Sequence, residues 1–477
     1  MNPDAQLFVA GRWRPAEGGA TAPVYNPATE EEIGRHAVAS VGDLDEAVEA
    51  ASRAFPGWRA IGPLERSRLM RRAAGLVRDR AAAIASIMTA EQGKPVAEAE
   101  REILNSADII EWFAEEGRRA YGRVIPSRSP DVMQTVLEEP IGIVAGFSPW
   151  NFPIAQAARK IAAALAAGCP IILKGPEDTP ACCAAFVAAF AEAGIPEGVI
   201  SLVFGDPAAI SDHLIAHPGV RKISFTGSTT VGKLLAAKAG AHMKRCTMEL
   251  GGHAPAIVCD DADLDVALKT LAMAKFRNAG QVCIAPTRFL VQRRVYDAFL
   301  DMFIGAAKDI RVGNGADPAS TMGPLAHGRR LEAMESLLAD GLKHGGVAEL
   351  GGQRVGNKGH FFAPTVVTGL ARDARLMNEE PFGPVALFAP FNDLEEAIAE
   401  ANRLPYGLAA YAFTRSAAVA HKLSSAIETG MLSINHHGMS LPEVPHGGIK
   451  DSGYGSEGGL EALKGYMTFK FVTHAVG

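Results

Sequence analysis

A cysteine stands at the end of a turn beyond the middle of the chain, where its thiol has the setting of a nucleophile. Cys283 closes the stretch Phe-Arg-Asn-Ala-Gly-Gln-Val-Cys, in which a helical pattern gives way to a glycine-containing turn before a strand that carries Pro286. Such a turn holds a side chain at the end of a rigid element, facing a cleft. A lone cysteine is otherwise most often a small buried hydrophobe, so Cys283 needs partners to count as a catalyst.

Two further motifs provide the side chains that a thiol nucleophile needs. Covalent catalysis at a carbonyl requires a base and an oxyanion donor besides the nucleophile. Glu249 opens the motif Glu-Leu-Gly-Gly, and Asn151 lies within Trp-Asn-Phe-Pro. Asn151 is also placed to serve as an ordinary helix N-cap. Together the three residues favour covalent catalysis on a carbonyl substrate.

With these motifs the chain resembles the aldehyde dehydrogenase superfamily, and the similar motifs extend over residues 26–458, nearly the whole length. The resemblance implies the α/β aldehyde dehydrogenase fold, with a Rossmann-like NAD(P)-binding domain, an α/β catalytic domain and a β oligomerisation arm. It also implies a homodimer or homotetramer. The expected ranges are 1–120 and 140–250 for the cofactor domain, 251–447 for the catalytic domain, and 121–139 with 448–477 for the arm.

The resemblance assigns catalytic roles to five residues. Thiolate attack by Cys283 on an aldehyde makes a tetrahedral alkoxide, for which the family uses the side-chain amide of Asn151 and the backbone N–H of the cysteine. Glu249 matches the residue that activates water to hydrolyse the resulting thioester. Lys160 and Glu457 match positions linked to proton transfer. Their ordinary alternatives are a surface lysine on a helix and a solvated glutamate in a glycine-rich loop.

The cofactor implied by the resemblance is NAD, with NADP as the alternative. Lys174 and Glu177 match the positions that meet the adenosine ribose, where a carboxylate repels a 2′-phosphate. Glu380 matches the residue on the nicotinamide ribose, and Phe382 matches the ring beside the nicotinamide. The other residues predicted to bind the cofactor, several of them around the pyrophosphate, are Ser148, Trp150, Gly205, Phe225, Gly227 and Ser228.

Two glycine motifs suggest other nucleotide sites and are set aside. Residues 227–233 nearly spell a P-loop, but Leu234 stands where a hydroxyl is required to hold Mg²⁺. What remains is a helix N-terminus able to hold a phosphate through backbone N–H groups. Residues 453–458 match Gly-x-Gly-x-x-Gly but lie in the C-terminal tail without a strand, turn and helix around them, so they do not predict a Rossmann fingerprint.

Two arginines indicate an anionic substrate. Arg159 follows Asn151 by eight residues and Arg277 precedes Cys283 by six, and both offsets match arginines that hold the distal carboxylate in succinate-semialdehyde dehydrogenases. Two guanidinium groups near a thiol suit a carboxylate and favour the thiolate, whereas the alternative is a pair of structural salt bridges. Ser440 lies near the position of a matching serine in those enzymes, but the sequence of its loop departs from theirs.

The predicted function is NAD(P)-dependent oxidation of a carboxylate-bearing semialdehyde, either succinate semialdehyde or 2-oxoglutarate semialdehyde, to the dicarboxylic acid. The wording of several segments is most similar to bacterial 2-oxoglutarate-semialdehyde dehydrogenases. The alternative is a broad-specificity enzyme for uncharged or aromatic aldehydes. CoA-acylating relatives generally lack a glutamate at the position of Glu249, and a non-catalytic structural protein has no need to retain Cys283, Asn151 and Glu249 together.

The elements around these motifs predict how they are positioned. Helical spacing of apolar residues predicts helices over 43–55, 65–90 and 97–120, and residues 121–139 predict a hairpin. From residue 141 onward short apolar strands alternate with helices, which is typical of βαβ units and a parallel sheet. Thr179 before Pro180, and Asp206 before Pro207, predict capped helix starts. This repeated order of strand, polar turn and helix is a dinucleotide-domain pattern.

Composition disfavours several other classes. The 477 residues are 48% hydrophobic and 21% charged with a net charge of −6, and no block of Lys or Arg predicts nucleic-acid or anionic-membrane binding. The apolar stretch 161–173 is too short, and too broken by Gly168 and Pro170, to span a bilayer. Six scattered cysteines predict neither a disulfide framework nor a metal site. Because Met1-Asn2-Pro3-Asp4 has neither a basic nor an apolar leader pattern, the cytoplasm is the expected location.

Overall fold

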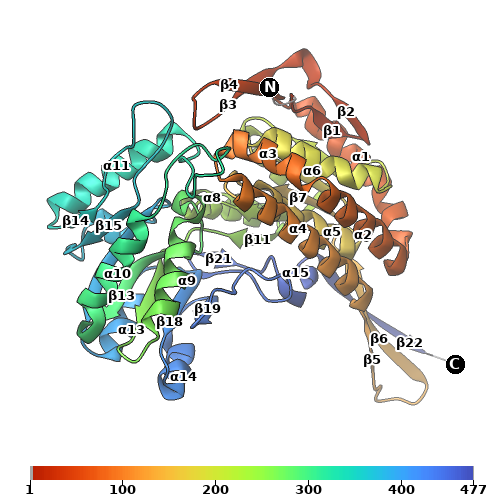
Figure 1. Cartoon of the computed structure of the whole chain (residues 1–477). Coiled ribbons are helices and arrows are strands. Elements are labelled where there is room, and N and C mark those ends of the chain that lie inside the picture. The colour runs from red at the N-terminus through yellow and green to blue at the C-terminus, as the bar shows by residue number, and fades with distance from the viewer. Residues whose placement is uncertain (1–3, 476–477) are drawn as a thin grey trace.

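The computed structural model describes residues 4–475, which form two lobes and a projecting arm (Figure 1). Residues 1–3, which belong to the N-terminal segment considered for a leader, and residues 476–477 lie outside the described residues. Within residues 4–475, no helix combines the length and the apolar character needed to cross a membrane. The mixture of helices and sheets confirms the predicted α/β class.

The first lobe holds an eight-stranded sheet with a parallel centre and the strand order β2-β1-β9-β8-β7-β10-β11-β21. Neighbours among β7 to β11 pair in parallel, whereas β1, β2 and β21 pair antiparallel at the edges. Buried on both faces, a parallel strand is a continuous apolar run, as β7 is. The strands are β1 (Leu7–Val9), β2 (Arg12–Arg14), β7 (Ile143–Phe147), β8 (Ile171–Lys174), β9 (Ile200–Val203), β10 (Val220–Thr226), β11 (Arg245–Glu249) and β21 (Gly453–Tyr454).

The helices of this lobe include four that precede the arm and pack against the helices that follow it. Helix α2 packs against α4 and α4 against α5, while α1 lies against β1, β7, β8 and β9 of the sheet. The helices are α1 (Val41–Ala60), α2 (Pro63–Asp79), α3 (Ala81–Gln92), α4 (Val96–Glu116), α5 (Pro153–Ala167), α6 (Pro180–Glu192), α7 (Pro207–Ala216), α8 (Thr229–Ala241) and α15 (Gly459–Lys464).

Two local predictions in this lobe need correction. The helix predicted over 65–90 is two helices, because Arg80 adopts φ −103° and ψ 5° between α2 and α3; the apolar spacing is helical on both sides, so it does not reveal the break. Thr179 precedes α6 as predicted but makes no capping bond. The carboxylate of Glu91 instead accepts hydrogen bonds from the N–H groups of Ala181 at 2.8 Å and Cys182 at 3.0 Å. The predicted cap Asp206 is confirmed, since it accepts from the third residue along.

The second lobe holds a seven-stranded sheet with the order β14-β15-β16-β13-β12-β18-β19. Its strands pair in parallel except for β14 at one edge. The strands are β12 (Ala254–Val258), β13 (Pro286–Gln292), β14 (Val347–Leu350), β15 (Thr365–Thr368), β16 (Val385–Phe391), β18 (Ala409–Phe413) and β19 (Met431–Ile434), and the helices are α9 (Leu264–Phe276), α10 (Tyr296–Lys308), α11 (Gly328–Lys343), α12 (Arg375–Asn378), α13 (Leu394–Asn402) and α14 (Ala417–Ala426).

The smaller elements connect and extend the two lobes. Two-stranded ladders are formed by β3 (Thr21–Tyr25) with β4 (Glu32–Ala37), and by β17 (Tyr406–Gly407) with β20 (Ile449–Lys450). Short 3₁₀ turns lie at η1 (Glu17–Gly19), η2 (Gly117–Arg119), η3 (Arg277–Gly280) and η4 (Arg293–Val295).

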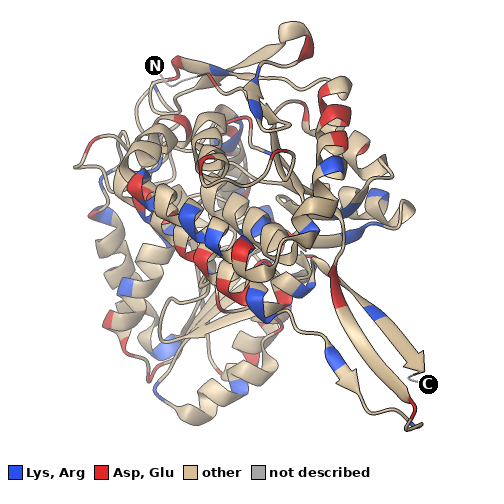
Figure 2. Cartoon of the chain, turned by 90° about the vertical axis from the view of Figure 1, so that its right-hand side faces the viewer, with Lys and Arg blue, Asp and Glu red and all other residues tan. Residues whose placement is uncertain are grey.

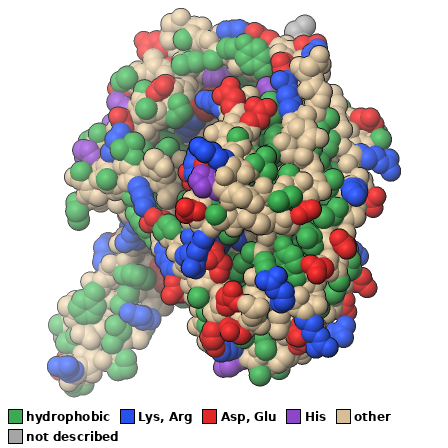
Figure 3. Space-filling model, turned by 90° about the vertical axis from the view of Figure 1, so that its left-hand side faces the viewer, with side chains coloured by type: hydrophobic (Ala, Val, Ile, Leu, Met, Phe, Trp, Pro, Cys, Tyr) green, Lys and Arg blue, Asp and Glu red, His purple; other side chains and the backbone are tan. Residues whose placement is uncertain are grey.

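The arm is a three-stranded sheet in the order β22-β6-β5, and it projects away from both lobes (Figures 1 and 2). Its strands are β5 (Arg123–Ile125), β6 (Val132–Pro140) and β22 (Met467–Ala475). Large apolar side chains on it are exposed, and Figure 3 shows apolar atoms on the arm at the lower left. These exposed residues are Val124, Met133, Leu137, Phe469 and Phe471.

The buried apolar residues fall into separate clusters for the two lobes. One cluster contains buried residues up to Leu250 together with four from residues 462–467, and the others begin at Ala254. The segment 448–466, expected in the arm, lies elsewhere, because β21 joins the first sheet beside β11 and β20 pairs with β17. The strands β20 and β21 are only two residues long, and a sequence pattern does not reveal pairings that short. The division into domains otherwise stays a prediction.

Candidate active site

The cysteine turn is held in an uncommon backbone conformation. Helix α9 ends at Phe276, and the next turn contains three successive residues with positive φ: Asn278 at 49°, Ala279 at 52° and Gly280 at 72°. A Cβ on Gly280 would lie 2.1 Å from the backbone oxygen of Gly383, so only glycine fits there. Non-glycine residues in this region store strain that surrounding structure must offset. The turn delivers Cys283 to a cavity just before β13.

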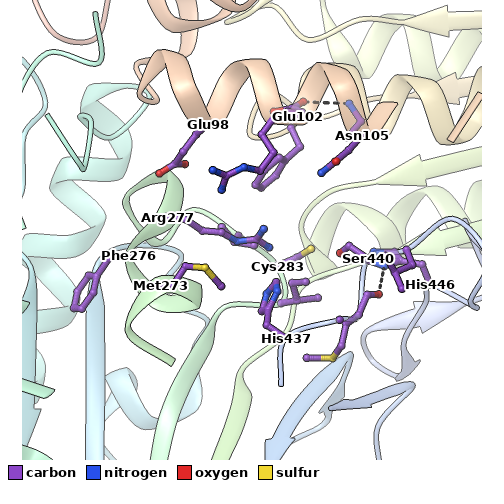
Figure 4. A pocket seen from close by; sticks show the side chains of 18 of the residues that line it. Glu98, Glu102, Asn105, Met273, Phe276, Arg277, Cys283, His437, Ser440 and His446 are labelled. Carbon is purple, nitrogen blue, oxygen red and sulfur yellow. Dashed lines mark hydrogen bonds between the residues drawn. The ribbon is translucent and has the colours of Figure 1, made fainter. Parts of the chain in front are cut away.

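The cavity at Cys283 has a volume of about 530 Å³ and lies between the two lobes (Figure 4). Figure 4 shows Arg277, Cys283 and His437 close together, with Glu98, Glu102 and Asn105 on helix α4 across the cavity. Much of the wall is apolar, and these side chains include Ile109, Phe152, Met273, Phe276, Ile310 and Met439.

Asn151 lies beside the cysteine turn and is not a helix cap. It is buried, and its Nδ2 donates to the backbone oxygen of Gln281 at 3.1 Å. Helix α5 begins at Pro153 with Phe152 in the N-cap position. The alternative N-cap role therefore does not apply to Asn151. Its side-chain amide is instead held against Gln281, which precedes Cys283 by two residues.

Glu249 ends β11 as a buried carboxylate whose two oxygens have no hydrogen-bond partner among the described residues. Burial, and then the charge of Glu457, raise its pKa well above the usual range. One oxygen faces Gly447, where a Cβ would approach to 3.0 Å. The carboxyl group thus has the free oxygens and high proton affinity that a general base for water requires.

Lys160 and Glu457 form a buried ion pair, which excludes a surface position for either. Glu457 also accepts hydrogen bonds from Ser224 at 2.8 Å and Thr226 at 3.1 Å, while Lys160 donates to Thr226 at 2.5 Å. Burial alone would raise the pKa of Glu457, but the Lys160 ammonium and these hydrogen bonds hold it below its usual value. The pair is a closed, charged network next to Glu249.

The Cys283 thiol is strongly shifted toward its protonated form. Burial raises its pKa to about 12, the carboxylates of Glu380 and Glu249 add to the rise, and the guanidinium of Arg277 opposes it. Since the thiolate is the nucleophile, proton removal from Cys283 is a step that the site must assist.

The predicted substrate residues all line the cavity of Cys283, although they are held differently. Arg159 is buried and donates to the backbone oxygens of Glu457 at 2.9 Å and Ser440 at 3.0 Å. Arg277 is half-buried over the face of Phe152, with an Nε that has no partner among the described residues. Ser440 is exposed at the edge of the cavity and holds Arg159 through its backbone rather than its hydroxyl.

Several polar residues of the cavity wall were missed by the sequence argument: Arg101, Asn105, Gln156, His437 and His446. Gln156 lies three residues before Arg159 on α5, which places both on one helix face. His437 belongs to the loop whose sequence departs from that of succinate-semialdehyde dehydrogenases. That departure was a usable signal that residues of this loop line the cavity. Its ring stacks on Tyr411, and its Nε2 has no partner within residues 4–475.

The predicted cofactor residues gather at one edge of the first sheet. They lie at the carboxyl ends of the parallel strands β7, β8, β9 and β10, which is where open α/β sheets bind ligands. Lys174 ends β8 and Phe225 lies near the end of β10, whereas Ser148, Trp150, Gly205, Gly227 and Ser228 come just after their strands. Ser228 caps α8. Lys174 and Glu177 form an ion pair.

The second lobe brings Glu380 and Phe382 next to these residues, since Glu380 and Thr229 both approach Gly251 and Phe382 contacts Trp150. Glu380 accepts one hydrogen bond, from the Gly252 N–H at 3.1 Å. Nearby, the buried hydroxyl of Thr229 at the start of α8 has no partner among the described residues. The ring of Phe382 meets Trp150 edge to face at 5.7 Å. An unpartnered hydroxyl, a carboxylate and a helix N-terminus suit the ribose and phosphate groups of a dinucleotide, so the residues present fit such a cofactor.

Within residues 4–475, no group of three or more His, Cys, Asp and Glu side chains has the arrangement of a metal site.

Comparisons with known proteins agree over nearly the whole chain. The sequence model of the aldehyde dehydrogenase family matches residues 13–472. The 4-(hydroxymethyl)benzenesulfonate dehydrogenase TsaD1 of Comamonas testosteroni is 47% identical over 467 residues, 98% of this chain and 97% of that protein. The succinate semialdehyde dehydrogenase of Acinetobacter baylyi is 41% identical over 466 residues, 98% of this chain and 96% of that protein.

The fold comparison leads to the same family. The crystal structure of succinate-semialdehyde dehydrogenase from Burkholderia pseudomallei matches with a TM-score of 0.97 and 42% identity, covering 99% of this chain and 98% of that chain. The predicted aldehyde dehydrogenase fold is thereby confirmed. The family match and these comparisons establish that the chain belongs to the aldehyde dehydrogenase family and is an NAD(P)-dependent oxidoreductase of aldehydes.

Proposed function

We propose that the protein oxidises a carboxylate-bearing semialdehyde, succinate or 2-oxoglutarate semialdehyde, to the dicarboxylic acid through a thioester on Cys283. One observation carries the choice of an anionic substrate. Arg159 and Arg277 line the cavity that contains Cys283, and no carboxylate oxygen of the described residues lies within 4.0 Å of either guanidinium. Guanidinium groups left without an ion pair beside a reactive thiol suit the distal anion of a substrate.

In the proposed first step, the Cys283 sulfur gives its proton to water in the cavity and attacks the aldehyde carbon as the thiolate. The carbonyl electrons move to the oxygen, and the Asn151 amide with the Cys283 backbone N–H stabilises the alkoxide. Arg277 lowers the pKa of Cys283 against the larger effect of burial and so favours the thiolate. When bound, the dinucleotide supplies the hydride acceptor that makes this reaction an oxidation.

In the proposed second step, Glu249 takes a proton from a water molecule whose oxygen attacks the thioester carbon. The carbon–sulfur bond breaks, its electron pair stays on the sulfur as the Cys283 thiolate, and the acid leaves. The raised pKa of Glu249, caused by burial and then by Glu457, makes it a strong base, and its two unpartnered oxygens leave acceptors for water. The buried Lys160 and Glu457 pair is the proposed path for the proton away from Glu249.

A second candidate substrate is an aromatic aldehyde that carries an anionic group. Phe152, Phe276 and Met273 give the cavity an apolar wall, and its volume of about 530 Å³ exceeds the needs of a four-carbon chain. The name of the Comamonas relative also specifies a benzenesulfonate, in which an aromatic ring carries an anion. Both candidates share the anion, and they differ in what fills the space between it and the aldehyde.

The proposed cofactor preference is NAD over NADP. Glu177 supports it, because a carboxylate next to the adenosine ribose repels a 2′-phosphate. The proposed assembly is a homodimer or homotetramer formed through the arm, whose exposed Phe469 and Phe471 suit burial against another copy.

The test is the initial rate of NAD(P)H formation with matched aldehydes. The panel pairs succinate, glutarate and 2-oxoglutarate semialdehydes with uncharged aldehydes of equal length, and benzaldehyde with its 4-sulfonate and 4-carboxylate. We expect every anion to be preferred over its neutral partner, and the order among the anions ranks the candidates. Equal rates on neutral and anionic aldehydes would overturn the proposal.

The arginine variant that isolates the anion site is Arg277→Ala. Arg159 also holds two backbone carbonyls, so its loss disturbs the C-terminal segment as well. Arg277→Ala should raise KM for the anionic aldehydes by about 10- to 100-fold, since a charge-assisted pair contributes about 1.5–3 kcal/mol. It should change KM for the neutral aldehydes little, while the smaller thiolate fraction lowers kcat for neutral and anionic aldehydes alike. The exposed Arg53→Ala on α1 is the matched control.

A further inference from the structure

A buried ion pair lies directly behind the turn that carries Asn151. Lys94 is 1% exposed, and its Nζ donates to Glu102 Oε2 at 2.5 Å and to the backbone oxygen of Asn151 at 2.8 Å. The ammonium also lies 4.1 Å from the centre of the Phe152 ring. Three separate partners thus surround the Lys94 cation, and one of them is the main chain of the proposed oxyanion residue.

The other oxygen of Glu102 holds the far end of the same turn. Glu102 Oε1 accepts from the N–H groups of Ile154 at 3.0 Å and Ala155 at 3.1 Å, which are free at the start of α5. Lys94 therefore fixes the carbonyl at the beginning of the turn, and Glu102 fixes the amides at its end. We call Lys94 and Glu102 the turn clamp.

The Asn151 carbonyl is also the point where the clamp meets the cysteine turn. Asn278 Nδ2 donates to this same oxygen at 3.0 Å and to the Gln281 oxygen at 3.2 Å, and Asn151 Nδ2 donates to that Gln281 oxygen at 3.1 Å. Gln92 Nε2 in turn donates a hydrogen bond to Asn278 Oδ1 at 2.8 Å and so fixes the Asn278 side chain. One hydrogen-bonded network thus joins the clamp in the first lobe to the segment that delivers Cys283.

Stability alone does not account for an ion pair at this depth. Removing two charges from water is costly, and a buried pair of apolar side chains of similar volume is often as stable or more so. A precise orientation does account for it, because misplacing a catalytic group by about 1 Å costs about 100-fold in rate. The main-chain oxygen that accepts from Lys94 and the two N–H groups that donate to Glu102 all lie on the turn of Asn151.

We propose that Lys94 and Glu102 are positioning residues that fix the Asn151 amide opposite Cys283. The inference rests on the oxyanion role proposed for Asn151 and extends it to a buried pair. Glu102 lies in the cavity wall, but both its carboxylate oxygens are bonded to Lys94 and to the turn. Loss of the clamp leaves Cys283 and the cofactor groove in place but lets the Asn151 amide move out of the position in which it meets the alkoxide.

The test is a mutant cycle between the clamp and Asn151. The variant Lys94→Met/Glu102→Gln leaves no unpaired buried charge and keeps an acceptor for the α5 amides. We expect it to lower kcat by about 10- to 100-fold in the parent and to cause no further loss in the Asn151→Ala background. The dissociation constant of NAD should change less than about twofold. The control variant is Arg14→Met, which removes an ion pair with Asp43 in the cap of α1. It should keep the parent kcat, because neither residue lines the cavity.

The outcomes separate failure of the clamp from failure of the oxyanion role. If the clamp variant loses as much kcat in the Asn151→Ala background as in the parent, the clamp does not act through Asn151. An unchanged kcat in the clamp variant would also overturn the inference. If Asn151→Ala alone keeps the parent rate, the oxyanion role is wrong and the inference falls with it. Glu102→Gln alone, which keeps the α5 acceptor and changes only the ion pair, serves the same cycle if the double variant does not fold.

Discussion

Glu249 and Glu457 are two buried carboxylates that interact through their charges but differ in hydrogen bonding. Glu457 accepts from Ser224 and Thr226 and is paired with Lys160, whereas Glu249 has no partner among the described residues. Burial and the charge of Glu457 raise the pKa of Glu249, and the Lys160 ammonium keeps that of Glu457 low against burial. Glu249 is therefore the carboxylate suited to take a proton from water, while Glu457 is charged at rest and can hold a proton only in passing.

The pH dependence of turnover should move when Glu457 loses its charge. Activity that needs ionised Glu249 rises with pH through its raised pKa. Glu457→Gln removes the repulsive charge and leaves Lys160 unpaired, and both effects lower the pKa of Glu249. The acid limb of the kcat profile should therefore move to lower pH. The exposed Glu443→Gln is the control, and a limb that stays in place in Glu457→Gln would contradict the assignment.

Removal of the Glu249 carboxylate should separate the two chemical steps. Glu249→Ala should still give a burst of NAD(P)H that corresponds to formation of the thioester, followed by turnover lowered at least about 100-fold, in the range that general-base catalysis contributes. Rapid-mixing absorbance at the nicotinamide band measures both phases. Turnover at the parent rate in this variant would remove Glu249 from hydrolysis.

The reactivity of Cys283 should depend on Arg277. Burial raises the pKa of Cys283 to about 12, and Arg277 is the cation that opposes this. Arg277→Ala should raise the pKa further and slow alkylation by the neutral reagent iodoacetamide several-fold at neutral pH, because less thiolate is present. Arg101 lines the same cavity but is exposed, so Arg101→Ala should alkylate as the parent does. A rate unaffected by Arg277→Ala would show that the thiolate is stabilised elsewhere.

Gly280 should not tolerate a side chain. Its φ of 72° and the approach of a Cβ to 2.1 Å from the Gly383 oxygen predict that Gly280→Ala destabilises by about 2–4 kcal/mol. Gly75 lies within α2 with no atom near the place of a Cβ. Gly75→Ala should instead stabilise by up to about 1 kcal/mol, since alanine is the better helix former. Thermal midpoints measured side by side decide, and equal midpoints would mean that the cysteine turn adapts.

Cofactor choice should respond to Glu177. Glu177→Ala removes the carboxylate that repels a 2′-phosphate and frees Lys174 from its ion pair. The ratio of kcat/KM for NADP to that for NAD should rise by about 10-fold or more, as expected for a charge-assisted contact of about 1.5–3 kcal/mol. Arg53→Ala again provides the unchanged reference. An unaltered ratio would place the 2′-phosphate away from Glu177.

Short sequence patterns predicted many of the helices and strands. Continuous apolar runs predicted the parallel strands, and Asp206 before Pro207 predicted a capped helix, because each pattern is complete within a few residues. The cap of α6 was missed, since its acceptor Glu91 is 90 residues away in sequence from Ala181. The end at Arg80 was missed because periodicity continues on both sides of it.

The same distinction applies to the site. Motifs around Cys283, Asn151 and Glu249 are contiguous, so they pointed to the elements that meet at the cavity. Partners that come from distant segments carried no such pattern. Lys94 contacts Asn151 across 57 positions, and the cavity wall of Arg101 and His437 is assembled from α4 and a loop of the second lobe. These contacts depend on tertiary packing, which periodicity does not encode.

Glu457 is synthesised long after Lys160, so their ion pair can form only near the end of translation. Glu457 is 297 positions from Lys160, and β21 just before it adds to the sheet strand that ends in Glu249. A nascent chain can complete its central strands and its cysteine turn, yet Lys160 lacks its ion-pair partner until residue 457 has been translated. Such distant pairings slow folding. We therefore expect activity in a translation reaction to come from chains that extend past residue 457, and shorter products to contribute none.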